Sequence, residues 1–88
     1  MKKIFKYSSG THTSFKIEMP YKAIIRSVQM QGNKLCFWAE IDEDHLHPFE
    51  QRSFSLFGTG WDLNVEDTAV YLATIQEDGF VWHVYEHV

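Results

Sequence analysis

Hydrophobic and polar residues alternate with a period of two along most of the chain, a pattern typical of strands that bury one face. Phe15, Ile17 and Met19 alternate with polar neighbours until Pro20 ends the run. Residues 24–31 and 35–41 repeat the pattern on either side of Gly32-Asn33, which suits a two-residue turn because both residue types tolerate positive φ. Residues 23–41 are therefore predicted to form a β-hairpin.

A second hairpin is predicted at the end of the chain. Residues 70–75 and 80–85 alternate in the same way, and Glu77-Asp78-Gly79 between them contains the Asp-Gly pair that favours a tight turn. Residues 52–57 indicate a further strand, and residues 3–7 an edge strand, because lysines protect an open sheet edge from pairing.

Helical spacing of apolar residues never extends beyond two turns, and the best helical candidate, residues 64–69, would make one turn at most. We therefore expect an all-β fold in which six to seven short antiparallel strands form a meander, folded into a small sandwich or open barrel. At 88 residues the chain makes a single β domain, residues 1–88.

Composition limits the location and the oligomeric state that we expect for this domain. Cys36 is the single cysteine, so no intramolecular disulfide is possible. Neither a signal peptide nor an apolar run of membrane-spanning length is present, and the cytoplasm is the expected location. Seven Phe, four Tyr and three Trp exceed what one core of this size usually holds. A homo-oligomer that buries an edge strand or an aromatic face is therefore expected.

Charge is divided unevenly along the sequence. The net charge of -4 disfavours binding to long nucleic acid. Residues 1–34 hold seven of the eight Lys and Arg residues and one acid, whereas residues 35–88 hold one arginine and eleven acids. Either the early strands and the late strands neutralise each other across a sheet, or a separate basic face attracts an anionic ligand or an acidic subunit.

Enzymatic chemistry is not indicated. Cys36 lies in the middle of a predicted strand, where burial is expected, and no serine lies in a strand-turn-helix elbow. His45 and His47, with Asp42 and Asp44, could ligate a divalent ion, but the same residues suit a solvated acidic loop. The sequence predicts neither a catalytic residue nor a cofactor.

The segment Gly58-Thr59-Gly60-Trp61 is the best candidate for a binding site. Two glycines around a threonine allow positive φ at both ends, so that backbone amides converge on an anion, and Trp61 offers a flat face to a nucleotide base. Arg52 and Arg26 could supply charge to a phosphate. The alternative is a tight turn that uses the same glycines for steric reasons alone.

Two further residues complete the predicted ligand-binding set. His83, in the middle of a strand, is interpreted as a hydrogen-bonded structural histidine or as a ligand contact. Trp38, which faces away from Phe37 and Ala39 in the first hairpin, adds an aromatic ring. No metal ligand is included in this set.

Several motifs occur in an order that resembles a family of small proteins, a domain of unknown function, found mainly in tailed phages and prophages. They are Ile4-Phe5-Lys6-Tyr7, Ile17-Glu18-Met19-Pro20, Ser27-Val28-Gln29, Leu35-Cys36-Phe37-Trp38-Ala39, Phe57-Gly58-Thr59-Gly60, Tyr71-Leu72-Ala73-Thr74-Ile75-Gln76 and Val81-Trp82-His83-Val84-Tyr85-Glu86. Phe5 departs from the family, where Trp is expected, and Trp61 stands where His is common.

The resemblance implies a phage origin and a host-cytoplasm location, and it supplies no catalytic residue. The function it favours is a binding protein that antagonises host defence by sequestering a small anionic nucleotide messenger at an oligomer interface. Two alternatives stay open: an inhibitor that docks on a host protein through the acidic half of the chain, and a minor virion or assembly component.

Overall fold

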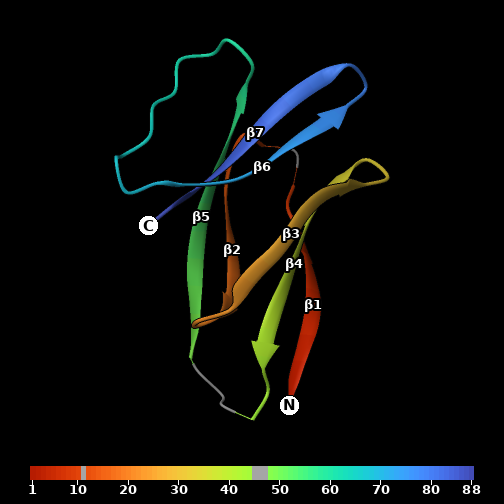
Figure 1. Cartoon of the computed structure of the whole chain (residues 1–88), viewed down its shortest axis with the longest axis vertical. Helices are drawn as coiled ribbons and strands as arrows, with labels where there is room; N and C mark the ends of the chain where they lie inside the picture. The colour runs from red at the N-terminus through yellow and green to blue at the C-terminus, as the bar shows by residue number, and fades with distance from the viewer. Residues whose placement is uncertain (11, 45–47) are drawn as a thin grey trace.

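Seven antiparallel strands build the protein in the computed structural model, which describes residues 1–10, 12–44 and 48–88 (Figure 1). They are β1 (Lys2–Ser8), β2 (Ser14–Pro20), β3 (Ile24–Gln31), β4 (Lys34–Asp42), β5 (Phe49–Gly58), β6 (Val70–Glu77) and β7 (Phe80–His87). The first sheet has the order β1-β4-β3 and the second the order β2-β5-β7-β6. The predicted all-β fold is confirmed, as a small sandwich of two sheets and not a closed barrel.

Both predicted hairpins form, each around a two-residue turn. Gln31 pairs with Lys34 across Gly32-Asn33, and Gly32 has a φ of 62°. Glu77 pairs with Phe80 across Asp78-Gly79, whose φ angles are 47° and 85°. Positive φ at both central residues is the type I′ geometry that matches the right-handed twist of paired strands, which explains the Asp-Gly sequence.

Strand order outside the hairpins departs from a simple meander. Among the described strands, only β3–β4 and β6–β7 pair neighbours in sequence, whereas β1 pairs with β4, β2 with β5 and β5 with β7. The physical reason is contact between the sheets: Phe37 of β4 and Phe54 of β5 are fully buried against each other, which brings strands from distant parts of the chain into one core. The predicted edge strand is confirmed, because β1 pairs with β4 alone.

The core lies between the two sheets and is built around three phenylalanines. The ring centroids of Phe37 and Phe54 are 4.7 Å apart, and Phe15 lies 6.0 Å from Phe37 and 5.6 Å from Phe54. Met19 and Val84 are also fully buried. Phe37 of the first sheet contacts Phe15 and Phe54, which are paired with each other in the second sheet, so these contacts fix which face of each strand points inward.

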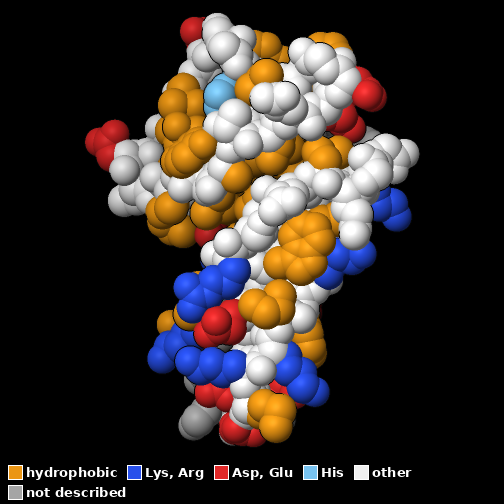
Figure 2. Space-filling model, turned by 45° about the vertical axis from the view of Figure 1, so that its right-hand side comes forward, with side chains coloured by type: hydrophobic (Ala, Val, Ile, Leu, Met, Phe, Trp, Pro, Cys, Tyr) orange, Lys and Arg blue, Asp and Glu red, His pale blue; other side chains and the backbone are white. Residues whose placement is uncertain are grey.

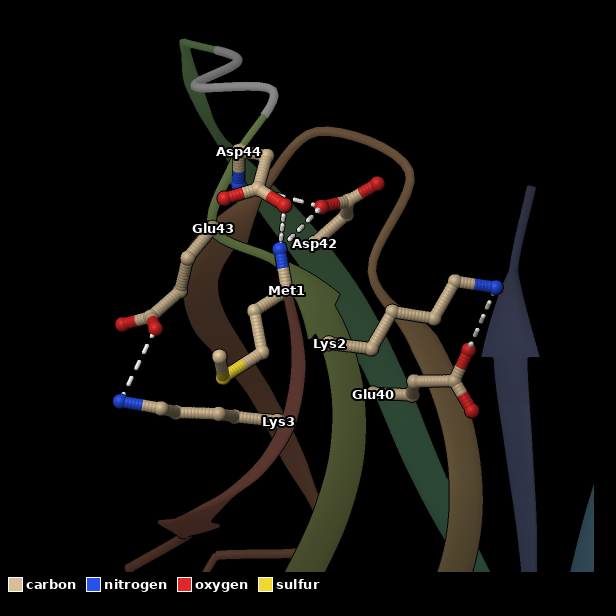
Figure 3. Close-up of polar contacts among 7 residues, drawn as sticks. All are labelled: Met1, Lys2, Lys3, Glu40, Asp42, Glu43 and Asp44. Atoms are coloured by element: carbon tan, nitrogen blue, oxygen red, sulfur yellow. Dashed lines mark hydrogen bonds and ion pairs between the residues drawn. The ribbon is translucent and has the colours of Figure 1, made fainter.

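Ion pairs join the basic early strands to acidic later residues at one end of the molecule (Figure 3). Lys2 lies 3.6 Å from Glu40, and Lys3 lies 3.0 Å from Glu43. The N-terminal ammonium of Met1 contacts the carboxylates of Asp42 and Asp44. Figure 2 shows this end with blue and red side chains side by side, while hydrophobic side chains gather on the broader end. Lys2 and Lys3 of β1 are therefore neutralised here by acids of β4 and of the turn that follows it.

Residues 59–69 connect β5 to β6 without regular structure. The predicted helical turn at 64–69 is absent, and a single hydrogen bond from the Ala69 amide to the Glu66 carbonyl, 2.9 Å long, makes a tight turn instead. Among the residues that the structure describes, no helix has the length and apolar character needed to cross a membrane.

Candidate functional site

The Gly58–Trp61 segment forms a tight turn at the end of β5. The Trp61 amide donates a hydrogen bond to the Gly58 carbonyl over 3.1 Å, and Gly60 has a φ of 89°. Positive φ at the third residue of a four-residue turn is the type II pattern, which strongly favours glycine there. The tight-turn interpretation of this segment is therefore confirmed.

The anion-binding backbone expected at this turn does not form. Positive φ occurs at Gly60 and not at Gly58, where the prediction required it at both glycines. The Trp61 amide is already used by the Gly58 carbonyl, so it cannot converge with its neighbours on an anion.

Gly58 is needed for a different reason, which is the position of the Trp61 side chain. A Cβ at Gly58 would lie 2.8 Å from both Cε2 and Nε1 of the Trp61 indole. The indole therefore lies directly over the Gly58 backbone, a position that any larger residue would obstruct.

Three aromatic rings gather beside this turn and wall a groove. The ring centroids of Trp61 and Trp82 are 5.4 Å apart in an edge-to-face arrangement, with an interplanar angle of 89°. Phe80 stacks on Trp82 at 6.1 Å with an angle of 24°. Trp61 is 55% exposed and Phe80 is 64% exposed, whereas Trp82 is half-buried and packs against the core. Trp82 is therefore held in place by the core and contacts two accessible rings, those of Trp61 and Phe80.

The groove has a volume of about 390 Å³. It is lined by residues of the turn and of the β6–β7 hairpin, namely Gly58, Thr59, Trp61, Gly79, Phe80, Val81 and Trp82. This volume lies within the range of small-molecule sites, roughly 300–1,000 Å³. Asp62 and Asp78, which follow and precede groove residues, are both exposed, so the charge next to the groove is negative.

His83 joins the turn to the sheet through a chain of hydrogen bonds. Its Nε2 lies 2.9 Å from the Thr59 hydroxyl, and its Nδ1 lies 3.1 Å from the Thr74 hydroxyl. The Thr74 hydroxyl is in turn 2.6 Å from that of Tyr71. The structure thus brings His83 to the predicted turn, where it holds the Thr59 side chain in place.

Three predicted site residues lie elsewhere. Arg52 is six residues before Gly58 on β5, roughly 20 Å away at about 3.3 Å per strand residue. Arg26 pairs with Glu40 over 3.1 Å on the first sheet, and Trp38 belongs to that sheet as well. The structure therefore separates both arginines and Trp38 from the aromatic groove.

Arg52 is committed to a largely buried ion pair. Its Nε and Nη2 donate to the two carboxylate oxygens of Glu86 over 2.6 and 2.8 Å, and its Nη1 donates to the Ala23 carbonyl over 2.5 Å. Hydrogen bonding to Glu86 raises the pKa of Arg52 above its usual value. With three donors engaged, this guanidinium fastens β5 to β7 and to the residue before β3.

Trp82 and Phe80 were not predicted as site residues. They alternate with Val81 and His83 after the Asp78-Gly79 turn, so the sequence alone indicates that Phe80 and Trp82 lie on the same face of the strand. Their position beside Trp61 depends on the pairing of Gly58 with Trp82, which joins strands that are not consecutive. No local sequence signal specifies that pairing.

The possible metal site is only partly within the described residues. His45 and His47 lie outside them, and Asp42 and Asp44 approach the N-terminal ammonium. Within residues 1–10, 12–44 and 48–88, no group of three or more His, Cys, Asp and Glu side chains is arranged to hold a metal ion.

Comparison with known proteins gives a family and no function. The family described as a domain of unknown function (DUF7352) matches residues 1–88, and the chain belongs to it. No curated protein and no solved structure matches the chain.

Proposed function

We propose that this DUF7352 protein is a binding protein that captures a nucleobase-containing small molecule in the groove beside Trp61. The observation that carries the proposal is the cluster of Trp61, Trp82 and Phe80, in which two highly exposed rings flank a half-buried one. Stacking of a base on an aromatic side chain contributes about 1–3 kcal/mol and accepts any base, because every base has a flat π face.

Electrostatics near the groove restrict how a nucleotide would bind. Asp62 and Asp78 are exposed beside the groove, and Arg52 and Arg26 are paired elsewhere. Phosphate groups would therefore extend away from the groove and find their counter-charge outside it. A second protomer that presents lysines to the groove would supply this charge, which is why we place the proposed site at an oligomer interface.

The biological setting of the proposal comes from the resemblance to small tailed-phage and prophage proteins. A phage protein that holds a nucleotide messenger in the host cytoplasm would lower its free concentration without any chemical step. Sequestration of this kind needs tight, reversible binding, which a preformed aromatic groove favours because little side-chain entropy is lost when the ligand binds.

The experiment titrates the protein with a panel of nucleotide messengers, each paired with the nucleoside that lacks the phosphates. Tryptophan fluorescence and thermal unfolding report binding, because Trp61 and Trp82 wall the groove. We expect quenching and a rise in Tm for at least one messenger, and release of the intact ligand when the complex is denatured. We expect a smaller effect for its nucleoside if phosphates contribute.

Two phenylalanines of equal exposure supply a matched control. Phe80 is 64% exposed inside the groove, and Phe49 is 63% exposed at the far end of β5. Phe80→Ala and Trp61→Ala should each weaken binding by about tenfold or more, since each removes one stacking surface, whereas Phe49→Ala should not change it. Absence of any response to the whole panel would refute the proposal.

A second candidate is a protein inhibitor that docks through exposed acids. Asp62, Glu66 and Asp67 in the β5–β6 connection, together with Asp78 in the last turn, are all exposed. Such an acidic surface would attract a basic patch on a host enzyme and increase the rate of their association. Stoichiometric co-purification of one host protein, lost when these acids are changed to asparagine or glutamine, would favour this candidate over ligand capture.

A further inference from the structure

A serine, a histidine and a glutamate form a hydrogen-bonded chain on the outer face of the second sheet. The Ser55 hydroxyl lies 2.6 Å from Nε2 of His87, and Nδ1 of His87 lies 2.9 Å from a carboxylate oxygen of Glu66. The order hydroxyl, Nε2, Nδ1, carboxylate is that of a serine nucleophile with its general base and orienting acid.

The fold brings these three residues together from distant parts of the chain. Phe54 and Glu86 are buried, so their neighbours Ser55 and His87 lie on the outer face of the sheet. In the β5–β7 register His87 is opposite Ser53, which places its ring diagonally across from Ser55. Such diagonal neighbours are within reach of a long or aromatic side chain.

Glu66 reaches His87 from the connection between β5 and β6. Both of these strands pair antiparallel with β7, so residues 59–69 must cross β7, and Figure 1 shows them as a long arc. The Thr68 hydroxyl donates to the Val88 carbonyl over 2.8 Å, and the turn from Glu66 to Ala69 closes beside it. These two bonds hold the carboxylate next to the end of β7.

The Glu66 carboxylate determines which ring nitrogen of His87 carries the hydrogen. An ionised carboxylate only accepts hydrogen bonds, so it selects the tautomer with hydrogen on Nδ1 and leaves Nε2 as the acceptor. The Nε2 lone pair is then aimed at the hydroxyl of Ser55. The hydrogen bond from His87 also lowers the pKa of Glu66 below its usual value, in keeping with an ionised carboxylate.

His83, a second histidine on β7, provides a comparison that shows the effect of Glu66 on His87. His83 also bonds a hydroxyl through Nε2, that of Thr59, but its Nδ1 meets the hydroxyl of Thr74. A hydroxyl can donate or accept, so it does not select one tautomer of the ring. The Ser55 arrangement therefore differs from that of His83, both of whose ring nitrogens meet hydroxyls.

We propose that Ser55 is a nucleophile for acyl transfer from small carboxylic esters, with His87 as its general base and Glu66 as a positioning residue. Ser55 and His87 are both partly accessible to solvent. Tyr85 is directly opposite Ser55 in the register, and the Phe57 ring lies 5.9 Å from that of Tyr85. This aromatic surface fits an ester that carries an apolar or aromatic group.

The proposed reaction is an ester hydrolysis in which water is the second substrate. The Ser55 oxygen forms a bond to the ester carbonyl carbon while its proton passes to Nε2 of His87. Collapse of the tetrahedral intermediate breaks the bond to the leaving alcohol, which takes that proton. Water then attacks the acyl group, gives a proton to His87, and releases the acid as the Ser55 hydroxyl is restored.

The test uses two probes on the full chain. A fluorophosphonate reports the nucleophile as one covalent adduct by intact mass, mapped to its residue by proteolysis, and p-nitrophenyl acetate reports turnover. We expect one adduct on Ser55, none on Ser55→Ala, and at least about a 100-fold slower reaction for His87→Gln, because a general base contributes about 10²–10⁴-fold. Ser53→Ala, a serine on the same strand and face, should react at the wild-type rate.

The role of Glu66 is tested by separate measurements, the rate of adduct formation and the tautomer of His87. Glu66→Gln should slow adduct formation by at least about tenfold, short of the roughly 10⁴-fold loss of a buried orienting carboxylate, and shift the His87 ring nitrogens in ¹⁵N NMR toward the other tautomer; Glu66→Asp should restore part of both. Glu66 is 67% exposed, so these variants should fold normally. No adduct on the wild type, or equal labelling of wild type and His87→Gln, would overturn the proposal.

Discussion

At the scale of single residues, Gly58 shapes the groove by having no side chain. A methyl group at this position would displace the Trp61 indole, which is 55% exposed and would move toward solvent. We predict that Gly58→Ala changes the free energy of unfolding by only about 0.5 kcal/mol, as for a typical surface substitution. The edge-to-face contact between Trp61 and Trp82 should be lost, and near-UV circular dichroism should report it.

Gly10→Ala is the matched control for this prediction. Among the described residues other than its chain neighbours, none lies within 4 Å of a Cβ at Gly10, and the φ of Gly10 is not positive. Its near-UV spectrum and its stability should match those of the wild type. An unchanged Trp signal in Gly58→Ala would show that the indole does not depend on the glycine.

Arg52 and Glu86 form the charged pair most relevant to stability. Their side chains are only 16% and 7% exposed, unlike the ion pairs at the N-terminal end. Removal of one partner leaves the other charge buried, which typically costs about 3–5 kcal/mol. We predict a loss of about 3 kcal/mol for Glu86→Leu in urea denaturation, partly recovered in the double variant with Arg52→Met.

An exposed pair gives the contrast for this prediction. Lys3 and Glu43 are 51% and 39% exposed, and such pairs contribute about 0–1 kcal/mol. Lys3→Met should therefore leave the urea midpoint nearly unchanged. If Glu86→Leu behaves like Lys3→Met, the buried pair has no special role in stability.

At the scale of elements, the β5–β6 connection is held to β7 by a bond that depends on pH. The hydrogen bond from His87 lowers the pKa of Glu66 below its usual 4.5. A lowered carboxyl pKa means that the stabilisation is complete above the usual pKa and disappears as pH falls through the folded-state value. The connection should loosen in acid while the strands remain paired.

We predict that the difference in Tm between wild type and Glu66→Gln is largest near neutral pH and is lost as pH falls below the usual pKa of a glutamate, through the lowered pKa of Glu66 in the folded state. Thermal unfolding monitored across this range measures it. A difference that stays constant over the whole range would contradict the assignment, because glutamine does not titrate. Asp67→Asn, in the same connection, serves as the charge control.

The two hairpins show how much of the fold was predictable at this scale. Alternation and the pairs Gly32-Asn33 and Asp78-Gly79 predict β3–β4 and β6–β7, because strand period and turn chemistry are local properties. The expected helical turn at 64–69 was wrong. Its polar residues instead serve contacts to β7, which is not adjacent in the sequence.

At the scale of the whole molecule, the sandwich divides the predicted binding set between two sheets. Gly58, Thr59, Gly60, Trp61 and His83 come together at one end of the second sheet. Arg52 lies at the other end of β5, and Arg26 and Trp38 belong to the first sheet. Within the described residues, the rings of the proposed site therefore lie together, whereas the two arginines predicted to bind phosphate lie elsewhere.

Charge across the molecule follows the same division. The basic early residues Lys2, Lys3 and Arg26 meet acids of β4 and of the turn after it, as in the first of the two interpretations of the uneven charge distribution, neutralisation between early and late strands. Exposed acids elsewhere, such as Asp62 and Asp78, lie beside the aromatic groove.

Local sequence specified the strands, both hairpins and the tight turn at Gly58–Trp61, because each depends on residues close together in the chain. Tertiary packing was needed to bring Trp82 and Phe80 to Trp61, to pair Arg52 with Glu86, and to join Ser55, His87 and Glu66. These contacts cross strands that are not consecutive. Their register is selected by packing Phe15, Phe37 and Phe54 between two sheets, which no local pattern encodes.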